Sequence, residues 1–298
     1  MKLLYDRLRI QERATDIAPL LADATVFYNN DALQQVIAGE VDLEELPTLA
    51  PPYPKFFVEC LMPRFDESRR LGMEIMPSIG VMISALDYPD GLLAQSFHTI
   101  DDQPYRWSYE MLLFMENKNT HKIENVGAGN ILLDVEGQAM PFATCEGGRP
   151  GYANFVWQQD FFTKMPKVED TERLNVLPQI MIDAALYTVG MLHCRNIGTE
   201  VVTPRRSESH KMEQRYGLPM TRYHILKVTG KGSAAGTLIG APGAGVPKSL
   251  HWCRGHFKTY TDDAPLMGKL TGTFYWGAQA RGRASRGVVT KDYEVMPS

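Results

Sequence analysis

Residues 250–260 hold a dense group of side chains that could do chemistry, in the order L-H-W-C-R-G-H-F-K-T-Y. Most of these residue types favour extended backbone, in which successive side chains point to opposite faces. One predicted face carries an indole, a phenol, an imidazole and two cations: Trp252, Arg254, His256, Lys258 and Tyr260. The other face carries His251, Cys253, Phe257 and Thr259, with Gly255 leaving a gap. The first face suits a phosphate-bearing ligand, because its cations and donors can pair with phosphate oxygens.

This predicted face also suits metal-independent cleavage of RNA. Such cleavage needs a group that ionises near neutral pH, as histidine does, and fixed cations for the phosphate. His256 would then exchange protons with His251 or His224, and Lys258 and Tyr260 would lie beside the phosphate. The alternative is an ordinary solvent-facing strand, which carries Arg, Lys, Thr and Tyr in many antiparallel sheets. A bulge at the glycine within the strand would exchange the faces beyond it.

A second basic segment follows the aromatic run 274–276 and reads G-A-Q-A-R-G-R-A-S-R-G over residues 277–287. We expect a glycine-punctuated loop that presents Arg281, Arg283 and Arg286. Aromatic rings beside arginines can stack bases while the guanidinium groups hold phosphates. The alternative is a solvated basic turn next to core aromatics, because the same aromatics favour a buried strand. Further cations of the same half are Arg205, Arg206, Lys211, Arg215 and Arg222.

We expect no metal site and no cofactor. His251, Cys253 and His256 are ligand types that zinc accepts, and the pair at 193–194 could add two more. A straight strand, however, puts His256 on the face opposite the other two, and the chain has no Cys-x-x-Cys pair. The glycine-rich segment 227–248 lacks the spacing of a phosphate-binding Walker loop and of a dinucleotide fingerprint. That segment predicts a flexible loop or a mobile lid.

The formal net charge of −4 conceals an uneven distribution. Residues 1–200 hold 16 Lys+Arg and 29 Asp+Glu, whereas residues 201–298 hold 15 and 6. Such asymmetry indicates a basic surface for an acidic partner, most commonly nucleic acid. The alternative is that the two parts neutralise each other within one fold. We predict an acidic region over residues 1–170 and a basic region over residues 171–298.

Composition and length indicate a soluble globular protein, with 298 residues of which 44% are hydrophobic and 22% charged. No apolar run approaches the roughly 20 residues that a membrane span needs. The first residues carry charges where a signal peptide would be apolar. The four cysteines are scattered and are typical of reduced, buried thiols: Cys60, Cys145, Cys194 and Cys253. We therefore expect a cytoplasmic protein without membrane contact.

Apolar residues at spacings of three and four predict helices in three regions. The first is 11–45, with one helix from Asp16 to about Phe27 and a second over 32–38 that residues 29–31 cap. The clearest helix covers 172–194. A short charged helix over 207–216 ends before Gly217.

Short apolar runs predict strands at 56–62, 72–85, 92–100, 105–116, 131–135, 197–202, 222–228, 250–260, 272–276 and 288–295. Residues 110–116 fit a helix equally well. Four prolines make 46–55 an extended connector. Because strands and helices do not alternate regularly, we predict an α+β fold with a mostly antiparallel sheet, a helical N-terminal region and one long buried helix.

Four C-terminal pieces form a recurring pattern: R-G-H-F-K-T-Y at 254–260, P-L-M-G-K at 265–269, G-T-F-Y-W at 272–276 and R-G at 281–282. Together they resemble uncharacterised proteins of bacteriophages, prophages and related mobile elements. The segments 193–197 and 222–228 are similar to the same group. The resemblance covers about the last third of the chain. It implies a phage or defence context and transfers no catalytic residue.

Three functions are consistent with these patterns. The leading hypothesis is that the basic half binds nucleic acid, with RNA favoured, through residues spread over this half: Arg222, Trp252, Arg254, Arg281, Arg283 and Arg286. The second is the metal-independent ribonuclease. The third is an accessory protein that binds another protein and has no chemistry of its own.

Overall fold

The computed structural model describes residues 3–37, 46–61, 78–87, 105–117, 120–140, 154–157, 171–229, 249–253, 255–277, 279–281 and 283–289. The predicted strand at 92–100 and most of the glycine-rich segment lie outside these ranges. The chain forms two compact units, residues 1–193 with 198–227 and residues 194–197 with 228–298. The two units are defined by how the chain packs. The predicted regions 1–170 and 171–298 are defined by charge, so their boundary need not coincide with that of the units.

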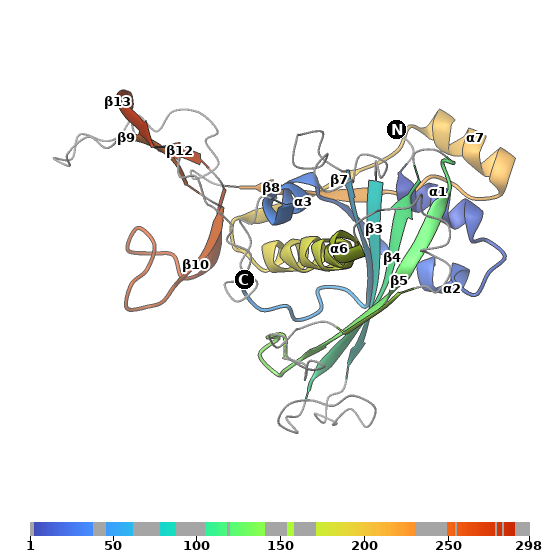
Figure 1. The fold of residues 1–298 in the computed structure, drawn as a ribbon, viewed down its shortest axis with the longest axis horizontal. Helices are drawn as coiled ribbons and strands as arrows, with labels where there is room; N and C mark the ends of the chain where they lie inside the picture. Colours follow the sequence, from blue (N-terminus) through green and yellow to red (C-terminus); the bar gives the residue numbers. More distant parts are fainter. Residues whose placement is uncertain are drawn as a thin grey trace. The chain divides into compact units, whose positions relative to one another are not determined.

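The first unit is organised around an eight-stranded sheet (Figure 1). Its strands in chain order are β1 (Thr25–Tyr28), β2 (Lys55–Leu61), β3 (Ser78–Asp87), β4 (Trp107–Glu116), β5 (Ile123–Leu133), β6 (Asn154–Trp157), β7 (Ile197–Val202) and β8 (Tyr223–Val228). Their order across the sheet is β6-β5-β4-β3-β2-β1-β8-β7. The pairs from β2 to β6 are antiparallel, and β1 runs parallel to both β2 and β8. The predicted α+β class is therefore confirmed, with a sheet that is mixed rather than wholly antiparallel.

The central strands are buried on both faces, which explains why they read as continuous apolar runs. On one face of β3, Gly80 leaves room for the ring of Phe57, since a β-carbon at Gly80 would come within 2.2 Å of Cζ of that ring. On the other face of the sheet, the rings of Phe56 and Tyr109 meet edge to face. Residues 110–116, which fitted a helix equally well, form part of β4. Burial between neighbouring strands selects the strand here, because a short apolar run does not show whether its hydrophobic residues repeat as in a helix or as in a strand.

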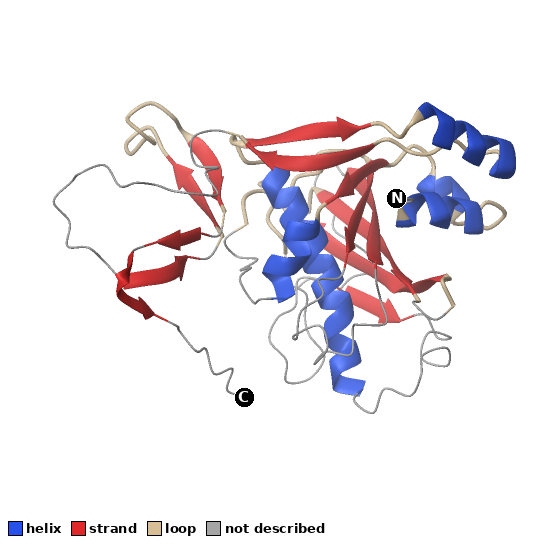
Figure 2. Ribbon diagram, turned by 90° about the horizontal axis from the view of Figure 1, so that it is seen from above, coloured by secondary structure: helices blue, strands red, loops and turns tan. Residues whose placement is uncertain are grey.

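Helices cover both faces of this sheet (Figures 1 and 2). The described helices are α1 (Leu4–Gln11), α2 (Ala18–Leu21), α3 (Asn30–Ile37), α6 (Thr171–Leu192) and α7 (Arg206–Tyr216), of which α7 projects beyond the end of the sheet. The helix α6 packs against α3 and β3, and α1 packs against β2, β3 and β5. Pro178 lies inside α6. From residue 180 onward, the described part of α6 is largely buried against the sheet and α3.

The N-terminal region differs from the prediction in two elements, of which the first is α1, a helix that precedes the predicted helical region 11–45. The expected helix from Asp16 to Phe27 is wrong, because its second half is the strand β1. Val26 and Phe27 are β-favouring residues, and pairing with β2 outweighs the weak helical spacing. The predicted cap of the next helix is confirmed, since Asn29 Oδ1 accepts a hydrogen bond from the backbone N–H of Ala32 at 3.2 Å.

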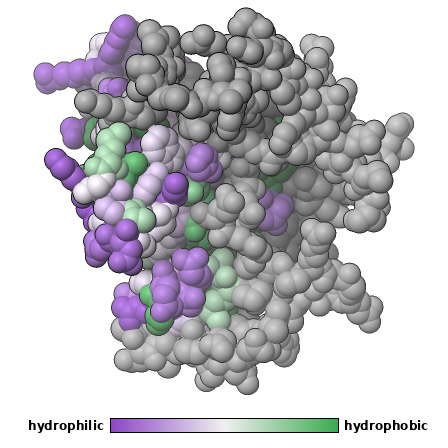
Figure 3. All heavy atoms as spheres, turned by 90° about the vertical axis from the view of Figure 1, so that its left-hand side faces the viewer, coloured by the Kyte–Doolittle hydropathy of each residue, from purple (hydrophilic) through white to green (hydrophobic). Residues whose placement is uncertain are grey.

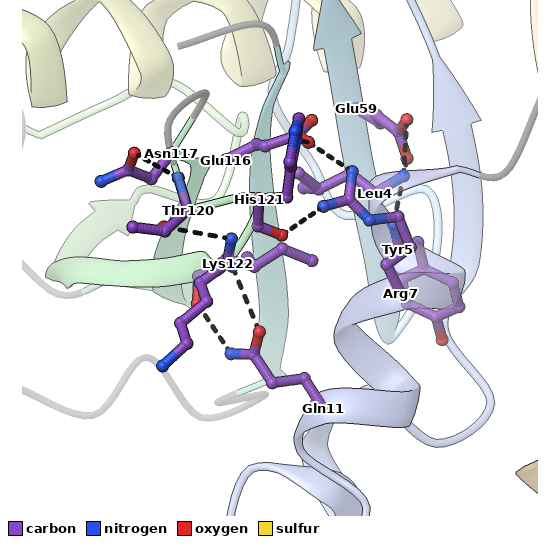
Figure 4. A network of polar contacts seen from close by, with 11 residues as sticks. Leu4, Tyr5, Arg7, Gln11, Glu59, Glu116, Asn117, Thr120, His121 and Lys122 are labelled. Atoms are coloured by element: carbon purple, nitrogen blue, oxygen red, sulfur yellow. Dashed lines mark hydrogen bonds and ion pairs between the residues drawn. The ribbon is translucent and has the colours of Figure 1, made fainter. Parts of the chain in front are cut away.

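A buried carboxylate ties α1 to the sheet (Figure 4). Glu59 of β2 is 1% exposed and accepts the backbone N–H groups of Leu4 and Tyr5 at 2.9 and 3.2 Å. These donors belong to the first turn of α1, where N–H groups have no partner within the helix. On the same helix, Arg7 pairs with Glu116 at 2.6 Å. Glu59 of β2 thus caps the first turn of α1.

Two of the cysteines, Cys60 and Cys194, are described and buried, as expected of reduced thiols. Burial raises the pKa of both thiols above the ordinary range, that of Cys194 to about 12. Both therefore stay protonated at neutral pH, which disfavours reactivity.

The second unit contains a three-stranded sheet and a separate hairpin. Its strands are β9 (Ser249–Cys253), β10 (His256–Tyr260), β11 (Gly272–Trp276), β12 (Gln279–Arg281) and β13 (Arg283–Val289). In the three-stranded sheet, β9 lies between β12 and β13, whereas β10 pairs only with β11 among the described strands. The predicted single strand over 250–260 is therefore wrong. It is two strands in two sheets, divided at the glycine that the sequence marked as its weak point.

Candidate nucleic-acid interface

The hairpin β10–β11 brings basic and aromatic side chains to one face. In this antiparallel ladder His256 pairs with Trp276, Lys258 with Phe274, and Tyr260 with Gly272. Directly opposed residues have their side chains on the same face. This basic–aromatic face consists of His256, Lys258, Tyr260, Phe274 and Trp276. The predicted grouping of His256, Lys258 and Tyr260 on one strand face thus holds for β10.

The side chains of the basic–aromatic face contact one another. Nζ of Lys258 lies 4.9 Å from the ring centroid of Tyr260, and that ring meets Phe274 edge to face at 5.8 Å. Phe274 is buried, whereas Lys258 is exposed and Tyr260 is half-buried. The buried phenylalanine therefore packs against the half-buried phenol, beside the exposed lysine. Figure 3 shows that hydrophilic and hydrophobic residues both occur among the described atoms on one face of the molecule.

The opposite face of the hairpin is held by different contacts. Phe257 packs against Tyr275 with ring centroids 5.4 Å apart, and the hydroxyls of Thr259 and Thr273 are hydrogen-bonded at 2.9 Å. The side chain of Asn196 binds the backbone of Tyr275, and the backbone N–H of Arg195 donates to the carbonyl of Thr273 at 2.8 Å. These bonds fix the hairpin along β11.

Arg195 adds a cation beside the basic–aromatic face. A β-carbon at Gly272 would lie 2.8 Å from Nε of Arg195, so the arginine side chain occupies the space that any other residue would need. Gly272 is also the ladder partner of Tyr260. Sequence reasoning missed Arg195, Phe274 and Trp276 as members or neighbours of this face. The alternation within 272–276 contained the signal for the two aromatics, but only the pairing register aligns them with β10.

Other predicted residues lie in the three-stranded sheet. Trp252 and His251 belong to β9, where they pair with Ala280 and Arg281 of β12. Arg283 pairs with Ser249, and Arg286 lies within the irregular part of β13, where the register shifts. The predicted loop over 277–287 is therefore wrong, because most of it forms strands. Arg254 lies outside the described residues.

Two predicted residues belong to the first unit. Arg222 is exposed just before β8. His224 lies on β8 with its ring centroid 5.3 Å from that of Phe27, and its Nδ1 is buried without a hydrogen-bond partner among the described residues. This environment is that of a residue at the edge of a core. The pairing of His256 with His224 or His251 in an acid–base pair stays a prediction.

Within the described part of the chain, no group of three or more His, Cys, Asp or Glu side chains could hold a metal ion. Over the same residues, no helix combines the length and the apolar character that crossing a bilayer requires. Comparison of the chain with protein-family models, with curated proteins and with solved structures finds no match.

Proposed function

We propose that this protein binds nucleic acid, RNA in preference, and that the basic–aromatic face of the β10–β11 hairpin is part of the contact surface. The observation that carries the proposal is the contact between Lys258 and Tyr260, in which Nζ lies 4.9 Å from the ring centroid, on the face that the ladder shares with Phe274. A cation that contacts an aromatic ring suits single-stranded nucleic acid, because the ring can stack on a base while the cation pairs with phosphate.

The surroundings of the face support the same proposal. The exposed side chain of Arg195 lies against Gly272, next to Tyr260 in the ladder, and adds a second cation. The excess of Lys and Arg over Asp and Glu in residues 201–298 favours an acidic partner. Aromatic platforms on β-sheets with adjacent cations are a common means of recognising unpaired bases.

Equilibrium binding of fluorescently labelled single-stranded RNA, measured by anisotropy between about 50 and 200 mM salt, tests the proposal. Lys258→Ala should weaken binding and reduce the salt dependence by about one phosphate contact. Tyr260→Ala should weaken binding by about tenfold, the scale of one lost stacking contact. The same sequence as DNA should bind more weakly if RNA is preferred.

The matched control is Thr259→Ala, which changes an exposed side chain on the opposite face of the same strand. It should leave binding unchanged. Loss of affinity in this control equal to that of Tyr260→Ala, or binding that does not depend on salt, would contradict the proposal. The same samples, incubated in excess EDTA, test the ribonuclease hypothesis, since cleavage that Lys258→Ala and His256→Ala abolish would assign chemistry to this face.

A further inference from the structure

A groove beside α7 in the first unit is independent of the hairpin. It is lined by one stripe of α7, by residues 203 and 204 just before the helix, and by the segment that returns from the end of the helix. Its volume is about 910 Å³, at the upper end of the roughly 300–1,000 Å³ usual for small-molecule sites. The side chains that line it and could bind a polar ligand are Arg206, Ser207, Ser209, His210, Glu213 and Arg222.

The walls of this groove are held in place by hydrogen bonds. Gly217 ends α7 in the left-handed conformation, with φ of 75°, and the chain turns back along the helix. The backbone N–H of Met220 then donates to Ser209 Oγ at 3.2 Å. The backbone N–H of Thr221 donates to Asp6 Oδ1 at 2.9 Å. The hydroxyl of Thr221 accepts a hydrogen bond from the guanidinium group of Arg9 at 2.8 Å. The return segment is therefore anchored both to α7 and to α1.

The two ends of the groove differ in charge. Because the return segment meets Ser209 at Met220, its continuation to Arg222 leads toward the first turn of α7, where Arg206 lies. Glu213 lies seven residues along the helix from Arg206, about 10 Å at 1.5 Å per residue. One end thus carries two guanidinium groups and the other a carboxylate, with the His210 imidazole between them.

We propose that this groove binds a small sugar phosphate, with the phosphate between Arg206 and Arg222 and a sugar hydroxyl donating to Glu213. Guanidinium groups hold a dianionic phosphate through paired, charge-assisted hydrogen bonds. Glu213 would repel a phosphate but accepts hydroxyl donors, so the ligand needs different groups at its two ends.

Isothermal titration of the full chain with ribose 5-phosphate, inorganic phosphate and ribose tests this inference. Ribose 5-phosphate should bind more tightly than phosphate, and ribose should not bind. Arg206→Ala and Arg222→Ala should each weaken ribose 5-phosphate binding by roughly tenfold or more, the scale of a lost charge-assisted bond. Glu213→Gln should remove the advantage of ribose 5-phosphate over phosphate.

Arg215→Ala is the control, because Arg215 is an exposed cation of the same helix that packs on the Tyr216 ring and does not line the groove. It should change affinity by less than about twofold. If Arg215→Ala and Arg206→Ala lower the affinity for ribose 5-phosphate equally, the ligand responds only to the net charge of the helix, and the proposed site is wrong. Absence of ribose 5-phosphate binding, or equal affinity for it and for phosphate, would overturn it as well. Lys258→Ala should leave this binding unchanged, which separates the groove from the hairpin proposal.

Discussion

Asn196 binds Tyr275 as a neighbouring strand would. Its Nδ2 donates to the carbonyl of Tyr275 at 2.6 Å, and its Oδ1 accepts the backbone N–H of Tyr275 at 2.8 Å. One side-chain amide thereby satisfies both backbone groups of a residue on β11. Unpaired backbone groups at a buried position would destabilise the strand. The hairpin that carries the basic–aromatic face thus depends on a residue that lies between α6 and β7 in the sequence.

The first prediction concerns this pair. Asn196→Ala should destabilise β11 by about 1–3 kcal/mol, because it leaves the N–H and the carbonyl of Tyr275 without their partner. Asn196→Asp keeps an acceptor for the N–H but loses the donor to the carbonyl. Hydrogen exchange at the Tyr275 amide should therefore be fastest in the alanine variant and intermediate in the aspartate variant. Protection equal to that of the unchanged protein in Asn196→Ala would contradict the role of this amide.

The second prediction is a pH dependence of stability that Glu59 causes. Burial raises the pKa of Glu59 from 4.5 to about 7, despite the opposing effect of the two backbone N–H groups that it accepts. The folded protein then keeps a proton that the unfolded chain releases between these two values. The stabilisation by this proton is present below about 4.5 and is lost as the pH rises through about 7. The free energy of unfolding should therefore fall over this window.

Urea denaturation of Glu59→Gln at several pH values checks this effect. The glutamine is neutral throughout, so its stability should depend less on pH over the same window than that of the unchanged protein. The difference should be on the order of a few kcal/mol. Glu110→Gln is the control, since Glu110 is exposed on β4. If Glu59→Gln and the unchanged protein have parallel profiles, Glu59 does not titrate in this way.

The third prediction separates backbone strain from steric overlap in the hairpin. Gly272 has φ of 106°, and a β-carbon there would lie 2.8 Å from Nε of Arg195. Gly268 has φ of 70°, and a β-carbon there would meet nothing within 4 Å. Backbone strain should lower the free energy of unfolding of both alanine variants by about 1–3 kcal/mol. Gly272→Ala should lose more, because the Arg195 side chain must also move. Thermal melts of the two variants measure the difference, and equal melting temperatures would mean that Arg195 moves freely.

The fourth prediction compares two neighbouring residues of β10. Phe257 is half-buried against Tyr275, so Phe257→Ala should cost about 1–3 kcal/mol, less than the ~3–5 kcal/mol of a fully buried ring. His256→Ala should cost less stability, because an imidazole buries less apolar area, but it should weaken RNA binding. Chemical denaturation and anisotropy provide the two measurements. Unfolding of the His256 variant while Phe257→Ala is silent would make the imidazole a core residue.

The sequence by itself determined the elements that have a strong local signal. The helix α7 ends at a glycine that adopts the left-handed conformation, and the alternation of β10 puts His256, Lys258 and Tyr260 on one face. The α+β class followed from the irregular order of helices and strands. Turn residues, caps and alternation act over a few residues, so a single chain reveals them.

Only the tertiary structure decided which strands are neighbours. The break at Gly255 puts His251 and His256 in separate sheets, and the register with β11 brings Phe274 and Trp276 to the face of Lys258. The roles of Arg195 and Asn196 likewise depend on contacts with residues more than 70 positions later in the chain. Local sequence gives the two faces of a strand, but pairing partners depend on burial and register across the whole fold. For that reason the residues that complete the candidate interface came from elements that the sequence alone could not bring together.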